Sequence, residues 1–240
     1  MRKLLNVMVF MLFTVPVGIL AGLITFSLIM SGMVKVRHWE RFPFWRRKLI
    51  IVSNHPSLLE TVLVPALFFP EYCLNPFFYI PWSTPDRKNF YDRWYWSWAR
   101  TISVPIDRTD ERNGVEALHR IKSLLDRKKI VVLFAEGGRT FKGDRFRYSA
   151  GGKRIRELKR TVGFLVARTG AEVLPIWVEG ADKVLLNHPT KLYGGIDLSQ
   201  RVTIKIGKIM RAKKALRIGS SRDITERITK LLLELADEKE

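Results

Sequence analysis

A histidine and a glutamate stand five residues apart in the segment from Asn54 to Glu60, which reads NHPSLLE. An imidazole can take a proton from a hydroxyl near neutral pH. A carboxylate that bonds the other ring nitrogen fixes the tautomer and stabilises the imidazolium that forms. His55 and Glu60 are therefore candidates for a general base and for the group that orients it.

The spacing of this pair constrains the local structure. Five residues of continuous helix would point the two side chains in different directions. The apolar, β-branched stretch Leu49–Ser53 predicts a buried strand, and Pro56 suits the first turn of a helix that we expect to run to about Phe69. A histidine in the strand-to-helix turn could then meet a carboxylate one turn into the helix. The alternative is a polar helix cap beside an ordinary surface glutamate.

Two glycines and an arginine follow a second buried strand, predicted at Ile130–Phe134. Glycine permits a positive φ and a close backbone approach, so the amide groups of such a loop can face an anion. A guanidinium can bond a phosphate through two parallel hydrogen bonds. Gly137, Gly138 and Arg139 therefore form a candidate anion-binding loop.

Two further residues could serve the same loop. Glu136 directly precedes the glycines and could position the loop or a substrate hydroxyl. Arg108 follows another strand predicted at 102–106, so its guanidinium could converge on the same anion. The alternative is a plain glycine turn with solvated arginines.

Strands and helices alternate along the rest of the chain. Further strands are predicted at 173–178 and 201–206. Apolar periodicity predicts helices at 90–99, 114–127, 161–169 and 224–235. This alternation predicts an α/β fold with a mostly parallel central sheet flanked by helices.

The run from Leu4 to Val34 contains no charged residue, and a dense basic stretch follows it. About twenty apolar residues can span a bilayer. The run therefore predicts a membrane anchor, either one tilted helix or a helical hairpin that bends near Pro16 and dips into one leaflet. A cleaved signal peptide is the competing interpretation. We expect a membrane-anchoring segment at residues 1–34 and a folded domain at 35–240, which the basic flank places on the cytoplasmic side.

The 240 residues include 42 Lys and Arg against 23 Asp and Glu, a net charge of +19. A chain this basic favours polyanions, either anionic lipid headgroups or nucleic acid. Its single cysteine, Cys73, cannot form an internal disulfide, which favours a reducing compartment. Paired cysteines and histidines at ligand spacing are lacking, so we expect no metal site.

Four segments in this order resemble the glycerolipid acyltransferase family, of the 1-acylglycerol-3-phosphate (lysophosphatidic acid) acyltransferase type. Within roughly residues 45–210, they read NHPSLLE at 54–60, VPIDR at 104–108, FAEGGR at 134–139 and VLPIW at 173–177. The first is similar to the family's H-x4-D motif and the third to its F-P-E-G-T-R motif. The ordered set, rather than any single motif, carries the resemblance.

The resemblance implies a membrane-bound O-acyltransferase domain at 35–240. Its expected reaction moves a fatty acyl group from acyl-CoA or acyl carrier protein to the free hydroxyl of a lysophospholipid, with 1-acylglycerol 3-phosphate as the expected acceptor. It implies His55 as the base and Glu60 as its orienting group. By the same resemblance, Arg108 and Arg139 hold the acceptor phosphate. Membrane lipid and the two substrates are the expected partners, without nucleic acid, metal or prosthetic cofactor.

The sequence departs from the family pattern at three positions. Glu60 replaces an aspartate, Ala135 a proline and Gly138 a threonine. The last change removes a hydroxyl from the acceptor loop, so another lyso-lipid, such as a lyso-aminolipid, stays open as the acceptor. A non-enzymatic basic protein that binds membranes or nucleic acid is the remaining alternative. It would explain the charge but not the ordered motifs.

Overall fold

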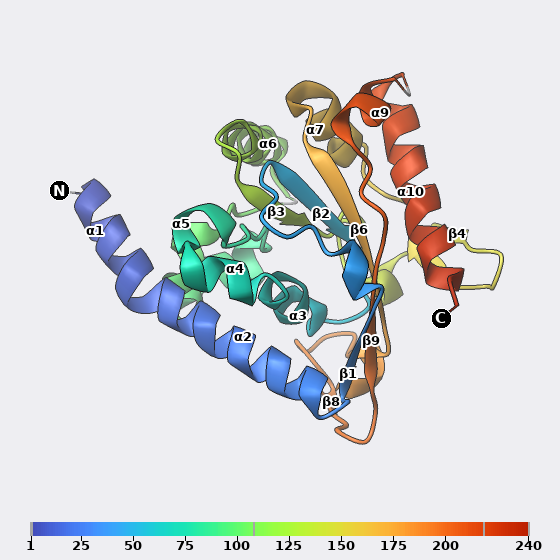
Figure 1. Cartoon of the computed structure of the whole chain (residues 1–240), viewed down its shortest axis with the longest axis horizontal. Coiled ribbons are helices and arrows are strands. Elements are labelled where there is room, and N and C mark those ends of the chain that lie inside the picture. Colours follow the sequence, from blue (N-terminus) through green and yellow to red (C-terminus); the bar gives the residue numbers. More distant parts are fainter. Residues whose placement is uncertain (1, 108, 218, 240) are drawn as a thin grey trace.

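A five-stranded sheet in the order β1–β9–β6–β2–β3 forms the centre of the molecule (Figure 1). The computed structural model describes residues 2–107, 109–217 and 219–239. The strands are β1 (Val34–Arg37), β2 (Leu49–Ser53), β3 (Ile130–Leu133), β6 (Glu172–Glu179) and β9 (Val202–Ile206). β2 runs parallel to β3 and β6, and β1 runs parallel to β9, whereas β9 is antiparallel to β6. The predicted, mostly parallel sheet is confirmed.

Helices cover both faces of this sheet (Figure 1). Successive side chains of a strand point to opposite faces. Ile50 and Val52 accordingly pack with α6 (Glu111–Asp126), α7 (Thr161–Thr169) and α10 (Ser221–Asp237). Leu49 and Ile51 pack on the other side, which is covered by α2 (Val15–Met30), α3 (Glu60–Ala66), α4 (Phe69–Leu74) and α5 (Pro76–Tyr79), while α1 (Arg2–Val9) extends beyond the sheet.

Shorter elements complete the chain. Two small antiparallel hairpins are β4 (Phe146–Tyr148) with β5 (Arg154–Arg156) and β7 (Leu185–Leu186) with β8 (Gly195–Ile196). The remaining helices are η1 (Phe10–Thr14), η2 (Trp39–Arg41), η3 (Arg87–Tyr91), η4 (Trp94–Ile102), η5 (Thr140–Lys142), α8 (Ala181–Val184) and α9 (Ala212–Leu216).

The strand predicted at 102–106 does not form, and a proline explains why. The segment is extended, and Val104 N donates to Ser83 O at 2.9 Å while Ile106 N donates to Pro85 O at 2.9 Å. The bond that would continue this ladder needs an amide hydrogen at Pro85, which proline lacks. Isolated bridges therefore replace a regular strand.

Two predicted helices also differ from the structure. The helix expected from Pro56 begins only at Glu60, because residues 56–59 form a turn that the Glu60 carboxylate closes by accepting from Ser57 N. The helix expected at 90–99 is divided between the π-turn η3 and the 3₁₀ helix η4. The helix predicted at 161–169 is confirmed, and Gly170 ends it with a φ of 62°.

The N-terminal apolar run forms one continuous helix from α1 through η1 to α2, so the hairpin alternative is wrong (Figure 1). The π-turn η1 ends at Thr14, two residues before Pro16, whose missing amide hydrogen interrupts the ordinary helical register. One side of the helix is docked on the domain: Tyr72 Oη donates to Gly18 O at 2.5 Å, and the ring of Phe69 lies against Gly22. Leu4–Met30, with a mean hydropathy of 2.5, is long and apolar enough to cross a membrane, by length and composition alone.

Candidate active site

Most of the predicted site residues that the structure describes lie where two neighbouring parallel strands end. His55 follows β2, and the loop with Glu136 and Arg139 follows β3. Asn54 fixes the first of these positions: its Nδ2 donates to Val178 O at 2.7 Å, and its Oδ1 accepts from Val178 N at 2.7 Å. The Asn54 side chain thus bonds the backbone of Val178 on β6 as a neighbouring strand would. These bonds fix the position of the next residue, His55. The only sequence signal for this role is the position of an asparagine directly after a predicted strand.

The structure brings His55 and Glu60 together. His55 Nδ1 lies 2.5 Å from Glu60 Oε1. Glu60 is fully buried, and its carboxylate also accepts from Ser57 N at 3.1 Å and from Ser57 Oγ at 3.0 Å. The imidazole stacks on Phe134, with ring centroids 4.6 Å apart. Because Nδ1 is bound to the carboxylate, Nε2 is the nitrogen that can meet a substrate hydroxyl.

Glu136 is a buried carboxylate that holds the two motifs to each other. Its Oε1 accepts from His55 N at 2.6 Å and from Thr140 Oγ1 at 2.8 Å, and its Oε2 accepts from Arg156 N at 2.9 Å. Thr140 N in turn donates to His55 O at 2.7 Å. Burial raises the pKa of Glu136, and these hydrogen bonds oppose that rise because they favour the charged form. Of the two roles expected for Glu136, positioning the loop is the one that these contacts serve.

Thr140 and Arg156 are contributors that sequence reasoning missed. Thr140 was visible as the residue after the arginine of the motif, but its partners could not be read from spacing. Arg156 contributes only its backbone amide to Glu136, so the identity of its side chain could not have pointed to this role in the sequence.

The glycine loop has the predicted backbone freedom at one of its two glycines. Gly137 has a φ of 71°, a conformation that favours glycine, and a Cβ there would lie 3.0 Å from Lys159 Cε. Gly138 is buried, and its φ lies outside the left-handed region. The loop therefore uses the left-handed conformation that glycine permits at Gly137 and not at Gly138.

Arg139 is almost buried, with 9% of its surface exposed. Its Nη1 donates to Leu192 O at 2.9 Å and to Asn187 Oδ1 at 3.1 Å, and its guanidinium lies 5.0 Å from the ring centroid of Phe141. Burial lowers the pKa of Arg139, while the charge of Glu60 acts in the opposite direction. Thr140, the residue after Arg139, donates its backbone N to His55 O at 2.7 Å, so the arginine lies near the histidine–glutamate pair. The second expected phosphate ligand, Arg108, lies outside the described residues.

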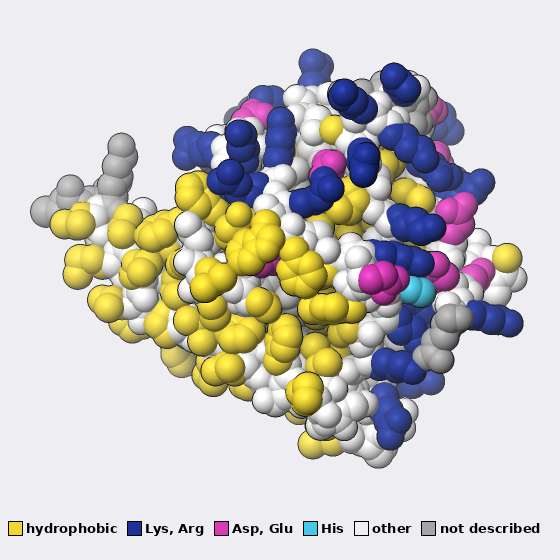
Figure 2. Space-filling model, in the orientation of Figure 1, with side chains coloured by type: hydrophobic (Ala, Val, Ile, Leu, Met, Phe, Trp, Pro, Cys, Tyr) yellow, Lys and Arg dark blue, Asp and Glu magenta, His cyan; other side chains and the backbone are white. Residues whose placement is uncertain are grey.

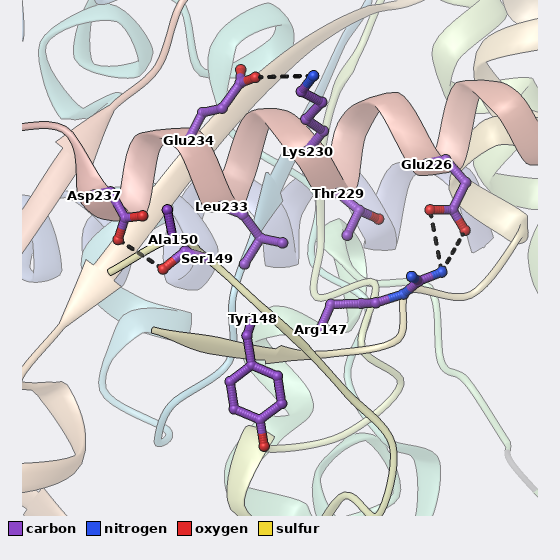
Figure 3. Close-up of a pocket in the computed structure, with 10 residues that line it drawn as sticks. All are labelled: Arg147, Tyr148, Ser149, Ala150, Glu226, Thr229, Lys230, Leu233, Glu234 and Asp237. Atoms are coloured by element: carbon purple, nitrogen blue, oxygen red, sulfur yellow. Dashed lines mark hydrogen bonds and ion pairs between the residues drawn. The ribbon is translucent and has the colours of Figure 1, made fainter. Parts of the chain in front are cut away.

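Other parts of the described chain offer weaker candidates. Among residues 2–107, 109–217 and 219–239, His, Cys, Asp and Glu side chains do not gather in a group that could hold a metal. A groove between the β4–β5 hairpin and α10 is lined by ten residues, which include none of the predicted site residues (Figure 3). Arg147 lies 3.2 Å from Glu226 and Lys230 lies 3.8 Å from Glu234, while the Asp237 carboxylate accepts from Ser149 Oγ at 2.7 Å. The charged side chains that line this groove are thus engaged within the protein, so the groove is a weaker candidate for a ligand site.

Two known proteins are similar to this chain in sequence. One relative is the 1-acyl-sn-glycerol-3-phosphate acyltransferase LPAT1, chloroplastic, of Arabidopsis thaliana, which is 27% identical over 156 residues, or 63% of this chain and 37% of the relative. Another is the 1-acyl-sn-glycerol-3-phosphate acyltransferase BAT2, chloroplastic, of Brassica napus, 27% identical over 150 residues, or 61% and 37%. The chain thus spans little more than a third of the length of these two relatives.

A solved structure shows the same fold. The crystal structure of the 1-acyl-sn-glycerophosphate (LPA) acyltransferase PlsC from Thermotoga maritima matches with a TM-score of 0.64 and 18% identity, covering 94% of this chain and 81% of that one. A model of the acyltransferase family matches residues 33–179, a stretch that includes the histidine–glutamate pair and the glycine loop. The chain therefore belongs to the acyltransferase family.

Proposed function

We propose that the protein is a membrane-bound O-acyltransferase that esterifies the free hydroxyl of a lysophospholipid, with 1-acylglycerol 3-phosphate as acceptor and phosphatidic acid as product. The acyl donor is a thioester, either acyl-CoA or acyl carrier protein. One observation carries this proposal: His55, bonded to Glu60, and the almost buried Arg139 follow the adjacent strands β2 and β3, and the bond from Thr140 N to His55 O joins their two segments. The names of the two plant relatives and of the Thermotoga protein support the choice of acceptor.

The histidine–glutamate pair supplies the chemistry of the proposed transfer. Nε2 of His55 takes the proton of the acceptor hydroxyl while its oxygen attacks the thioester carbonyl carbon. Glu60 stabilises the imidazolium that forms. As the new C–O bond is made, the C–S bond breaks, and the departing thiolate receives the proton from the imidazolium. The base activates the acceptor directly, so the reaction needs neither a covalent acyl-enzyme nor a prosthetic group.

Arg139 supplies the positive charge for the acceptor phosphate. A guanidinium taken out of water is costly unless it is paired, yet its hydrogen-bond acceptors within the described part of the chain are the neutral oxygens of Asn187 and Leu192. Both of these bonds leave from Nη1, so the donors on Nη2 and Nε remain for an anion. This arrangement favours a phosphate-bearing acceptor over an uncharged one.

An apolar face supports the proposed membrane association (Figure 2). Hydrophobic side chains gather over α1, α2 and the helices packed on them, whereas Lys and Arg gather over the rest of the visible surface. The outer face of the N-terminal helix includes large apolar side chains that are more than half exposed, namely Leu4, Leu5, Leu12, Phe13, Leu20, Leu23 and Ile24. We place this face in lipid and the domain on the cytoplasmic side, where the donor is found.

Replacing the arginine tests the acceptor. Arg139→Ala should raise the KM of a phosphate-bearing lysolipid about ten- to a hundredfold, the worth of a hydrogen bond to a charged group. The KM of the thioester donor should stay unchanged, and Arg139→Lys should restore only part of the loss, because an ammonium lacks the planar fork. Steady-state kinetics would compare this acceptor with a neutral lysolipid of equal chain length. Equal damage to both acceptors would show that Arg139 does not bind the acceptor phosphate, and the Gly138 departure would then point to a different headgroup.

Shortening the carboxylate tests the proposed base. Glu60→Asp removes one methylene, so the carboxylate cannot reach His55 Nδ1 and keep its bonds to Ser57. We expect kcat to fall about 10- to 100-fold, since a misplacement of about 1 Å can cost 10²-fold. His55→Ala gives the kcat that remains without the imidazole, which is the lower limit for this series. Glu226→Asp is the matched control, because Glu226 forms an exposed ion pair with Arg147. Wild-type kcat in a folded Glu60→Asp protein would contradict the role of the pair.

Charges placed on the apolar face test membrane association. The double substitution of Leu20→Glu and Leu23→Glu should lower the fraction of protein that sediments with phospholipid vesicles in high salt, because a charge in the bilayer costs roughly 2.5–3.5 kcal/mol. Val115→Glu is the matched control: Val115 is also apolar and 55% exposed, but it lies on α6, beyond the opposite face of the sheet. Release of the wild-type protein by high salt alone would show that surface charge, not the apolar face, holds it to lipid.

A further inference from the structure

One side chain from the loop between β7 and β8 contacts both halves of the site. Asn187 Nδ2 donates to Pro56 O at 2.7 Å. Asn187 Oδ1 accepts from Arg139 Nη1 at 3.1 Å. Pro56 directly follows His55 in the chain. A single half-buried amide therefore connects the arginine to the backbone beside the histidine.

An amide group suits this position for a chemical reason. It carries a donor and an acceptor on one planar group, so it can satisfy a carbonyl and a guanidinium at once. A carboxylate could also accept from Arg139, but it could not donate to Pro56 and would neutralise the arginine. A neutral acceptor fixes the guanidinium while its positive charge stays available to a substrate anion.

The same loop contacts the guanidinium a second time. Leu192 O accepts from Arg139 Nη1 at 2.9 Å. With Nη1 bonded to Leu192 and Asn187, the plane of the guanidinium is set, and its remaining edge can meet an anion in a defined direction. Orientation matters here because a bidentate contact to phosphate depends on both the distance and the plane of the group.

We propose that Asn187 is a positioning residue that aims Arg139 at the acceptor anion and fixes its distance from His55. This inference rests on the proposed role of Arg139 in binding the acceptor phosphate. Asn187 lies outside the four sequence motifs, 48 residues beyond Arg139, and acts through the arginine rather than on the substrate. Its loss should therefore appear in the KM of the acceptor and not in that of the donor.

The test is a double-mutant cycle measured with a phosphate-bearing lysolipid and one acyl-CoA. Asn187→Ala should raise the acceptor KM roughly three- to tenfold, the worth of one or two ordinary hydrogen bonds, and leave the donor KM unchanged. In the Arg139→Ala background, Asn187→Ala should have no further effect on the acceptor KM, because residues that act through one contact are not additive. Thr190→Ala is the control, since Thr190 is exposed in the same loop and its hydroxyl lies 3.3 Å from His188.

The outcomes separate this inference from the proposed function. If Arg139→Ala leaves the acceptor KM unchanged, the phosphate role of Arg139 is wrong, and the role of Asn187 is wrong with it. If Arg139→Ala raises the acceptor KM but Asn187→Ala does not, or if their effects add in full, only the assignment of Asn187 is overturned.

A second variant covers the case in which Asn187→Ala does not fold. Asn187→Asp keeps the size of the side chain and an oxygen for Arg139, but it loses the donor to Pro56 and adds a negative charge beside the anion. It should raise the acceptor KM at least as much as we expect from Asn187→Ala. A wild-type acceptor KM in folded Asn187→Asp would overturn the proposal.

Discussion

The rest of the site depends on the hydrogen bonds that the buried carboxylate of Glu136 accepts. A carboxylate inside a protein is costly unless hydrogen bonds replace the water that it loses, and this one accepts from His55 N, Thr140 Oγ1 and Arg156 N. These donors come from the segment after β2, the loop after β3 and the end of β5. The bonds that make the buried charge tolerable thus also hold three separate segments in one arrangement.

This arrangement places the histidine–glutamate pair and the Arg139 guanidinium near each other at one edge of the central sheet. The sheet fixes where β2 and β3 end, and Asn54 extends the pairing of β2 with β6 by one side chain. The backbone of His55 is then bound at both its amide and its carbonyl, while Glu60 orients the ring. The proposed base held in this way, and the Arg139 guanidinium held by the β7–β8 loop, satisfy the requirement for preorganised groups on a fixed scaffold.

Sequence reasoning could predict this site only as far as local patterns carry information. The buried strands at 49–53 and 130–133 and the histidine–glutamate pair were predictable, because apolar runs and motif spacing are local signals. The positions of Asn54 and Asn187 were not, because their partners lie 124 and 131 residues away along the chain, at Val178 and Pro56 respectively. The strand expected at 102–106 failed because of the proline on its partner segment, which a reading of the strand alone cannot detect.

The most direct test of this account is the kinetics of Glu136→Gln in a protein shown to be folded by thermal unfolding. Glutamine keeps the shape but has one acceptor oxygen and an NH₂ group, which must face either Arg156 N or the donors of His55 and Thr140. The account predicts that kcat falls by more than about tenfold and that the acceptor KM rises with it, since the base and the arginine both stand on segments that Glu136 holds. A folded Glu136→Gln protein with wild-type kcat and wild-type acceptor KM would contradict it.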